Sequence, residues 1–285
     1  KFKHFLNENT KSQSKKNIEY HYDLGNKFYT QWLDSSMTYS SAYFEKENDN
    51  LFDAQLNKYQ KIAESLNLNE NSEVLEIGCG WGGFSTYAAK NFKSKIDAIT
   101  ISKAQFEYAS KKIQKEGLGE KVSIKFKDYR DIDSQYSNIA SIEMFEAVGK
   151  KYWEKYFDVV KNSLANSGKA ALQIITIDEK RSFKYQNQPD FIQQYIFPGG
   201  MLPSKKELSS INQKVGLDFK EVKSFGLSYA KTLNLWNKQF QDSWQDLVKL
   251  GFNDRFKRMW EFYLAYCETG FISKSTDVSH FLINK

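Results

Sequence analysis

The 285-residue sequence is poor in cysteine, histidine and proline, and it has no long apolar run. Its two cysteines, Cys79 and Cys267, exclude a disulfide scaffold and a four-cysteine zinc site. Three histidines are too few for a histidine-rich metal centre, so no metal site is expected. The apolar runs on either side of Gln173 are far too short to cross a bilayer.

Aromatic residues, in contrast, are abundant. The chain holds 22 Phe, 17 Tyr and 6 Trp, which is 16% of its residues, although its mean hydropathy is −0.64. Such a content fits an ordinary core, a tunnel for a hydrophobic ligand, or stacking platforms for nucleic acid. The formal charge of +6 suits an anionic partner, either a phospholipid surface or a nucleic acid. Composition alone leaves these alternatives open.

Strands and helices alternate from residue 73 onward. Short apolar segments predict strands over 73–77, 95–100, 121–126, 139–142, 169–177, 217–224 and 276–282. Helices are predicted over 84–91, 103–116, 151–165, 232–250 and 254–269, and Ser102 is placed to cap the second of them. This alternation indicates an α/β fold with a mostly parallel sheet covered by helices on both faces. The long helical stretch before the final strand predicts one antiparallel strand near the edge of the sheet.

The segments before and within this core differ in character. A mostly helical pattern predicts an N-terminal cap over residues 1–68, followed by a core domain over 69–285. Within the core, residues 179–210 contain all three prolines and interrupt the alternation of strands and helices. We therefore expect this segment to be an insertion that lies over the sheet as a lid.

A glycine-rich turn connects the first predicted strand to the helix that follows it. The spacing Gly-x-Gly-x-x-Gly from Gly78 matches the fingerprint of nicotinamide-binding oxidoreductases, with Asp97 as the candidate ribose ligand. Asp97 lies inside the second predicted strand, however, whereas a ribose ligand should lie at its end. The fingerprint is therefore a weak signal for a dinucleotide.

The same turn fits a second motif, Glu76-x-Gly78-x-Gly80-x-Gly82. This string is typical of Rossmann-like methyltransferases that use S-adenosylmethionine. Its glycines allow the backbone to approach the methionine part of the cofactor closely, and Glu76 would orient the loop or hold the amino group. The loop alone favours a methyltransferase over an oxidoreductase.

Longer motifs extend the comparison along almost the whole chain. The segments 20–29, 37–44, 75–83, 100–105, 144–149 and 229–236, with Tyr263, 266–267 and 270–271, resemble those of the cyclopropane fatty acid synthase family. They occur in the same order and without large gaps from about residue 20 to the end. The resemblance implies a Rossmann-like class I methyltransferase fold.

The resemblance also implies an activity. The family transfers the methyl group of S-adenosylmethionine to the cis double bond of an unsaturated acyl chain, usually on a membrane phospholipid. The alkene attacks the methyl group, a carbocation forms, and loss of a proton closes a cyclopropane; other ways of quenching the cation give methyl- or methylene-branched chains. A methyltransferase acting on a small amine is the alternative within the superfamily, and a nicotinamide-binding oxidoreductase is the alternative outside it.

The partners and location follow from this resemblance. We expect a cytoplasmic protein that contacts the anionic inner face of the membrane peripherally, with phospholipid as substrate and no nucleic acid partner. The lysines at 150, 151 and 155 are candidates for contact with the headgroups. A homodimer is compatible with this expectation.

The cofactor residues are carried over by motif position. The resemblance places the amino acid part of the cofactor beside Tyr39 and Ser40, its ribose beside Thr100 and Gln105, and its adenine beside Tyr129. The complete predicted set is Tyr39, Ser40, Glu76, Gly78, Gly80, Gly82, Thr100, Gln105, Asp128, Tyr129 and Arg130.

The catalytic base is the point at which this sequence departs from the family. The resemblance implies a bound bicarbonate as base, held by Cys, Glu, His, Tyr and a backbone amide. Glu146 and Tyr229 stand at the Glu and Tyr positions, but Ser41 stands at the Cys position. We align the His position with Ile175, which cannot donate a side-chain hydrogen bond, and assign the backbone amide to Ile177.

Glu143 is the second position at which this sequence departs from the family, because the family often has glycine at the corresponding position. Two carboxylates beside one cavity raise each other's pKa, so Glu143 or Glu146 could serve as the base or replace bicarbonate. The alternative, which we weight equally, is that Glu143 binds the cofactor loop or a backbone amide.

The lid is assigned to residues 191–203, in which aromatic residues alternate with amides and Pro and Gly fix the turns. An alkene is a poor nucleophile, and its reaction requires a water-poor, aromatic-lined site that stabilises a carbocation. The candidates to line this tunnel or its lid are Tyr195, Phe197, Gly199, Trp236 and Tyr263.

Overall fold

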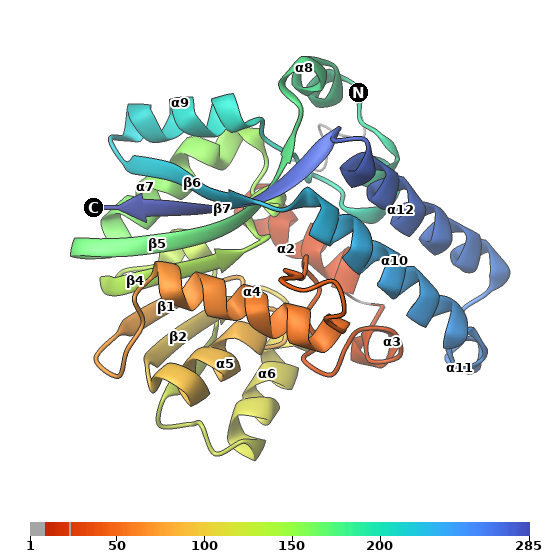
Figure 1. The fold of residues 1–285 in the computed structure, drawn as a ribbon, viewed down its shortest axis with the longest axis horizontal. Helices are drawn as coiled ribbons and strands as arrows, with labels where there is room; N and C mark the ends of the chain where they lie inside the picture. Colours follow the sequence, from red (N-terminus) through yellow and green to blue (C-terminus); the bar gives the residue numbers. More distant parts are fainter. Residues whose placement is uncertain (1–8, 23) are drawn as a thin grey trace.

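The computed structural model describes residues 9–22 and 24–285, which form one sheet with helices around it (Figure 1). The sheet has seven strands in the order β3-β2-β1-β4-β5-β7-β6. The strands are β1 (Glu73–Ile77), β2 (Lys95–Thr100), β3 (Val122–Phe126), β4 (Tyr136–Ile142), β5 (Leu164–Ile177), β6 (Asp218–Ser224) and β7 (Thr276–Asn284).

Within the sheet of the described residues, β7 runs in the direction opposite to the other six strands. It lies between β5 and the edge strand β6 and pairs antiparallel with both, whereas β3, β2, β1, β4 and β5 pair parallel. All seven predicted strands are present, and the predicted antiparallel strand is next to the edge. The expectation of an α/β fold with a mostly parallel sheet is confirmed.

Helices cover both faces of this sheet (Figure 1). One face carries α4 (Leu51–Ser65), α5 (Gly83–Phe92) and α6 (Lys103–Lys115), and the other carries α7 (Trp153–Ser163) and α9 (Lys205–Val215). Local capping explains where several begin. Ser102 accepts a hydrogen bond from the Gln105 N–H at the start of α6, as predicted, and Ser204 with Glu207 forms a capping box at the start of α9.

A third group of helices lies beyond the carboxyl ends of the strands. It comprises α2 (Lys11–Tyr22), α3 (Asn26–Tyr29), α10 (Gly226–Asp242), α11 (Trp244–Lys249) and α12 (Asp254–Ile272). The predicted helix over 232–250 is thus two helices, because the chain turns at Ser243. Aromatic side chains from α3, α10 and α12 pack together in one buried cluster.

The predicted segments outside the sheet have structure of their own. The lid segment 179–210 contains α8 (Glu179–Asn187), the short π-helical turn η4 (Ile192–Ile196) and the start of α9. The division at residue 68 remains a prediction; residues 1–8 of the cap lie outside the described part, and α4 packs on α5 and β5 of the core. Among the described residues, no helix is long and apolar enough to cross a membrane.

Candidate active site

The glycine turn after β1 has the geometry of a ligand-binding loop. Gly78, Gly80 and Gly82 have positive φ angles of 81°, 52° and 78°, a region that other residues avoid. A Cβ atom on Gly80 would have no heavy atom within 4 Å, because this residue borders open space. The backbone of the loop is therefore accessible to a ligand.

This open space is a cavity at the carboxyl ends of β1 and β2, which we call the first cavity. Ten of the eleven predicted cofactor residues line it: Tyr39, Ser40, Glu76, Gly78, Gly80, Thr100, Gln105, Asp128, Tyr129 and Arg130. Gly82 belongs to the same turn but is not part of the lining. It precedes α5 as the N-cap in a left-handed conformation and packs against Ala109.

Polar groups in the first cavity are partly used by the protein. Glu76 accepts a short hydrogen bond from the Ser85 hydroxyl at the start of α5. Burial raises the pKa of Glu76 to about 7, against the effect of the bonds from Ser85. This contact fits the expectation that Glu76 orients the loop. Thr100 donates to Gln105 Oε1 at 2.9 Å, which fixes the Gln105 amide at the cavity wall.

The far wall of the first cavity contains a half-buried ion pair. Asp128 and Arg130 lie 2.7 Å apart, and Arg130 also donates to the carbonyl of Asn9 and to Ser14 near the start of α2. The Tyr129 hydroxyl is buried and has no hydrogen-bond partner among the described residues. This hydroxyl is therefore available to a ligand in the cavity. Asp97 bonds to Lys125 and Tyr136 instead and does not line the cavity.

A second cavity, of about 1130 Å³, lies between β5, the lid segment, α10 and α12. Its wall is rich in aromatic and aliphatic side chains, including Tyr39, Ile175, Phe197, Tyr229, Leu233, Tyr263 and Phe271. A cavity of this size and composition suits a long apolar ligand. Of the predicted tunnel residues, Phe197 and Tyr263 belong to this wall.

The other three predicted tunnel or lid residues lie elsewhere. Tyr195 is 53% exposed, packs against Phe191 and does not line the cavity. Gly199 accepts a hydrogen bond from the Asn9 side chain. Trp236 is fully buried behind Tyr39 and Tyr229, with ring-centroid distances of 5.2 and 6.1 Å. Trp236 thus supports the wall without belonging to it.

The two cavities share part of their walls. Ile18, Tyr39, Glu143 and Ala147 line both of them. Tyr39 is held in place by a 2.8 Å hydrogen bond between its hydroxyl and that of Tyr263. Glu143 is the only ionisable group other than tyrosine in this shared set. A group transferred from one cavity to the other would therefore pass beside Glu143.

The Glu143 carboxylate accepts hydrogen bonds from several sides. Its Oε1 accepts from the Ser41 backbone N–H at 2.8 Å and from Gln173 Nε2 at 2.7 Å. Its Oε2 accepts from the Tyr229 hydroxyl at 2.7 Å. Glu143 itself has a φ of +50°, a conformation that glycine adopts more readily. The strained backbone places the carboxylate among these donors.

A buried lysine lies near this carboxylate. Lys58 on α4 is fully buried and donates to the Ser40 hydroxyl at 2.7 Å and to Gln55 Oε1 at 2.6 Å. Burial lowers the pKa of Lys58 to about 7, although the charge of Glu143 acts in the opposite direction. Burial likewise raises the pKa of Glu143, while Tyr229, Lys58 and the other donors act to lower it. Tyr229, Lys58 and the other donors thus favour the ionised form of Glu143, but burial has the larger effect and its pKa lies above the ordinary value.

Glu146 has a different environment. One carboxylate oxygen accepts from the Ile175 backbone N–H, but the other has no partner among the described residues. Burial, followed by the charge of Glu143, raises the pKa of Glu146 to about 8. Of the two carboxyl groups, Glu146 therefore retains its proton near neutral pH.

Three assignments around the base need correction. The Ser41 hydroxyl donates to the carbonyl of Ala42, and it is the Ser41 backbone N–H that reaches Glu143. The backbone amide that binds a carboxylate is that of Ile175, two residues before the predicted Ile177, whose N–H donates to Pro203. The side chain of β5 that faces Glu143 is Gln173.

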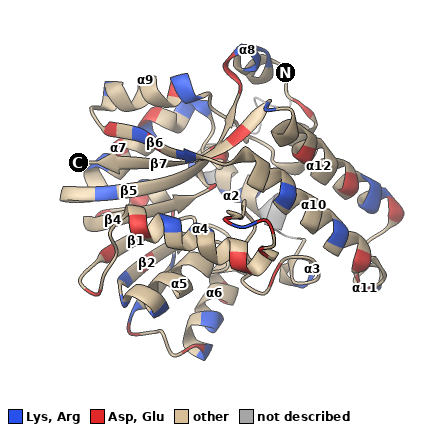
Figure 2. Ribbon diagram, viewed as in Figure 1, with Lys and Arg blue, Asp and Glu red and all other residues tan. Residues whose placement is uncertain are grey.

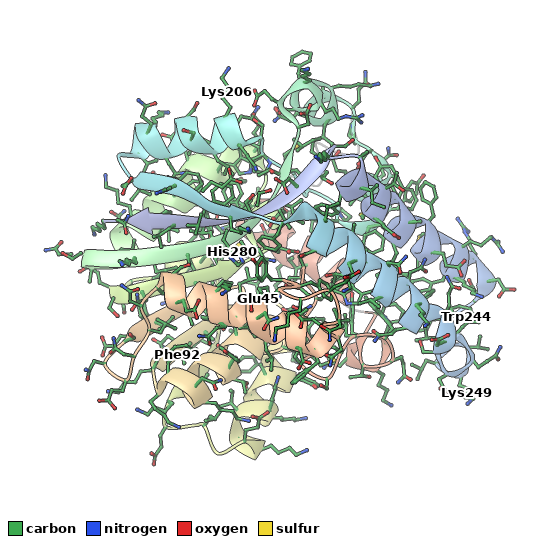
Figure 3. All side chains as sticks on the ribbon, in the orientation of Figure 1. Glu45, Phe92, Lys206, Trp244, Lys249 and His280 are labelled. Atoms are coloured by element: carbon green, nitrogen blue, oxygen red, sulfur yellow. The ribbon has the colours of Figure 1, made fainter. Side chains whose placement is uncertain are left out.

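Gln173 is held by His280 on the neighbouring strand β7, where the two residues are direct cross-strand partners. The His280 Nε2 lies 2.8 Å from Gln173 Oε1, and Figure 3 shows His280 near the middle of the molecule. Burial lowers the pKa of His280 to about 3, so the ring is neutral. This bond directs the Gln173 amide nitrogen at Glu143.

Sequence reasoning missed Lys58, Gln173 and His280, although two of them carried a signal. Lys58 lies at helical spacing from the buried residues Leu51 and Ala54, so it belongs to the apolar side of its helix. Gln173 interrupts an apolar strand. A buried polar group requires a partner, which is a reason to suspect a site. His280 has no comparable signal, since its partner is set by strand pairing.

Comparisons with known proteins agree with this geometry. The chain matches the family described as mycolic acid cyclopropane synthetase over residues 9–281. It is 38% identical to the tuberculostearic acid methyltransferase UfaA1 of Mycobacterium tuberculosis over 279 residues, which cover 95% of this chain and 65% of UfaA1. It is also 38% identical to the cyclopropane-fatty-acyl-phospholipid synthase of Escherichia coli over 251 residues, 88% of this chain and 63% of that enzyme.

The chain thus spans slightly less than two thirds of the length of these two relatives. Among solved structures, the mycolic acid cyclopropane synthase CmaA1 in complex with SAH and CTAB superposes with a TM-score of 0.89 at 27% identity. The alignment covers 95% of this chain and 98% of CmaA1. The chain belongs to the mycolic acid cyclopropane synthetase family.

Proposed function

We propose that this protein transfers the methyl group of S-adenosylmethionine to the cis double bond of an unsaturated phospholipid acyl chain. The observation that carries the proposal is the pair of cavities that meet at Tyr39 and Glu143. The relatives are named for methyl transfer to, or cyclopropanation of, fatty acyl chains, and CmaA1 holds SAH. Family membership and geometry support the same activity.

The residues of the first cavity fit S-adenosylmethionine. Gly80 leaves the space that a Cβ would occupy, and the unpartnered Tyr129 hydroxyl is available to the adenine. Gln105, fixed by Thr100, would hold the ribose, while Tyr39 and Ser40 would hold the amino acid part. When bound, the cofactor supplies an electrophilic methyl group.

The residues of the second cavity fit the acyl chain. Its apolar wall would exclude water and hold the alkene in line with the methyl group. Tyr39, Tyr229 and Tyr263 border the shared region with their rings, and aromatic faces stabilise positive charge. These side chains would therefore favour the carbocation that methyl transfer creates on the chain.

Glu143 is proposed as the base. After the alkene's π electrons have formed the new C–C bond, the Glu143 carboxylate would accept a proton from the cationic chain. Loss of that proton from the new methyl group closes a cyclopropane. If a 1,2-hydride shift first moves the cation to the methyl-bearing carbon, loss of a proton from the same methyl group gives a methylene branch. Three donors occupy three of the roughly four acceptor sites of the carboxylate, which leaves one for the proton.

Bicarbonate does not fit beside this carboxylate. The donors that would bind a small anion here, Ser41 N–H, Gln173 and Tyr229, already donate to Glu143. A second anion would also face the charge of Glu143 in a buried site. The carboxylate of Glu143 would thus replace the anion that the family resemblance implies.

The alternatives receive less support. An amine methyltransferase would need a small polar pocket, whereas the second cavity is large and mainly apolar. A nicotinamide-binding oxidoreductase would need an acidic ribose ligand, but Asp97 is engaged with Lys125 and Tyr136 outside the first cavity. We therefore retain phospholipid as the proposed substrate and the membrane surface as the place of reaction.

The test is incubation with S-adenosylmethionine labelled in its methyl group and a mixture of unsaturated phospholipids. We expect the label in an acyl chain that is heavier by one methylene unit, and fragmentation in the mass spectrometer distinguishes a ring from a branch. Label in an amine, or tight binding of a nicotinamide dinucleotide without binding of S-adenosylmethionine, would overturn the proposal.

A further inference from the structure

One face of helix α8 is anchored to α9. Asp178 caps its start by accepting from the Lys180 N–H at 3.0 Å. Ser182 and Gln186, one turn apart, donate to the Glu207 carboxylate of α9 at 3.0 and 2.8 Å. Their bonds contribute to lowering the pKa of Glu207 to about 2, against the effect of its burial. This anchored face fixes which residues of α8 can face outward.

A second face of α8 is cationic and borders the second cavity. Lys180, Arg181 and Lys184 are exposed and also line that cavity, so they lie at its mouth. None of the three forms an ion pair with a described acidic residue within 4.0 Å. Figure 2 shows blue segments on α8, which projects from the top of the molecule. Besides the buried Glu143 and Glu146, the described lining of the second cavity contains one acidic residue, Asp190. Its carboxylate accepts a hydrogen bond from the Tyr266 hydroxyl.

A third face of α8 carries an exposed aromatic ring. Phe183 is 81% exposed, more than any other large hydrophobic residue in the described part of the chain. Across the same cavity, Phe262 and Tyr266 of α12 are 52% and 43% exposed and belong to its lining. Phe191 links the lid to α12 through a ring contact of 4.7 Å with Phe262.

Exposed aromatic rings beside cations are the side chains that bind at the interface of an anionic bilayer. Here they surround the opening of an apolar cavity, so a lipid could pass from the bilayer into it without crossing water. We propose that α8 and the facing side of α12 dock on anionic bilayers, with Lys180, Arg181 and Lys184 binding headgroup phosphates and Phe183 inserting among the acyl chains. This inference rests on the proposed function, because it takes the second cavity as the acyl site.

Co-sedimentation with vesicles tests the docking face independently of turnover. The chain is mixed with vesicles of phosphatidylcholine alone or with added phosphatidylglycerol. We expect binding to require the anionic lipid and to fall with added salt. The double variant Arg181→Glu/Lys184→Glu should bind at least 10-fold more weakly, since each cation near such a surface contributes about 5-fold.

The matched control is Lys111→Glu/Lys115→Glu, which changes the net charge equally. Both control lysines are exposed on α6, at the opposite end of the molecule from α8 in Figure 1. Phe183→Ser provides a second test that leaves the charge unchanged, and it should also weaken binding. Two results would overturn the docking face. One is that the α6 and α8 charge variants lose vesicle binding equally. The other is that neither the α8 charge variant nor Phe183→Ser binds vesicles more weakly than the unsubstituted chain.

A separate assay distinguishes this failure from failure of the proposed function. Methyl transfer by the unsubstituted chain is measured on unsaturated phospholipid dispersed in neutral detergent, where no bilayer is needed. If methyl transfer occurs in detergent but the α8 substitutions leave vesicle binding unchanged, the docking face alone is overturned. If no methyl group is transferred to any lipid, the proposed function is overturned, and so is the assignment of the second cavity as the acyl site.

Discussion

The two cavities that meet at Glu143 are built in different ways. The first is made largely from the turn after β1 and the ends of neighbouring strands, so its residues are close in sequence to recognisable motifs. The second is made from side chains of α10, α12, the lid segment and β5, which are far apart in the chain. The proposed cofactor site thus depends on local backbone geometry, whereas the proposed acyl site depends on long-range packing.

The shared wall combines both kinds of construction. Glu143 follows β4 directly, after the strand predicted over 139–142, but its donors come from Ser41, Gln173 and Tyr229 in three distant segments. Its reactivity is therefore set by packing and not by the motif. Substitutions at and around this wall separate the contributions of the two cavities.

Glu143→Gln is expected to have the largest effect. The amide cannot accept a proton, so turnover should fall by about 1,000-fold or more. The first cavity keeps its other lining residues, so affinity for S-adenosylmethionine should change little. Calorimetry of cofactor binding and a radiolabel assay measure the two quantities. Full activity in this variant would show that Glu143 is not the base.

Lys58→Met is expected to lower turnover by about 10- to 100-fold, because it releases Ser40 and removes a positive charge near Glu143. Without this charge the pKa of Glu143 rises. Since the base must be ionised, the acid limb of the kcat profile should move to higher pH. Lys61→Met, on the same helix and paired with Glu45 at the surface, is the control. Identical pH profiles for both variants would contradict the coupling.

Glu146→Gln is expected to have a smaller effect, within about 10-fold at pH 7, because the side chain is already neutral there. The pKa of Glu146 is about 8, so above that pH a second negative charge forms beside Glu143. Activity of the unsubstituted protein should therefore decline on the alkaline side. The glutamine variant should lose this decline, and an unchanged alkaline limb would refute the assignment.

Trp236→Phe is expected to leave the reaction almost unchanged. Trp236 is buried behind the wall and does not line the second cavity, so the substitution should lower the free energy of unfolding by about 1–2 kcal/mol without altering acyl-chain preference. Phe197→Leu, within the wall, should alter the preference. Urea unfolding and competition between acyl chains measure these effects. A changed preference in the Trp236 variant alone would contradict the described lining.

The sequence predicted the fold and the first cavity well because both depend on local signals. Strand periodicity, the Ser102 cap and the glycine turn each act over a few residues. The second cavity was predicted less well. Tyr195 and Trp236 were chosen by motif position, but which way an aromatic side chain points depends on the elements packed around it.

The residues around the proposed base show the same limit of prediction from local sequence. We predicted that Ile175 faces the base, whereas the side chain that contacts Glu143 is that of Gln173, two residues earlier on the same side of β5. The pairing of β7 with β5, which brings His280 to Gln173, joins residues 107 positions apart. No local pattern encodes that contact.

The most direct test of the central claim, that the Glu143 carboxylate replaces a bound anion, is chemical rescue of Glu143→Gly. Glycine suits the φ of +50° and frees the donors of Ser41, Gln173 and Tyr229. Activity is measured in degassed buffer with and without added bicarbonate. We predict that the unsubstituted protein is indifferent to bicarbonate, whereas the inactive glycine variant regains activity with it. Dependence of the unsubstituted protein on bicarbonate, or full activity of the variant without it, would contradict the claim.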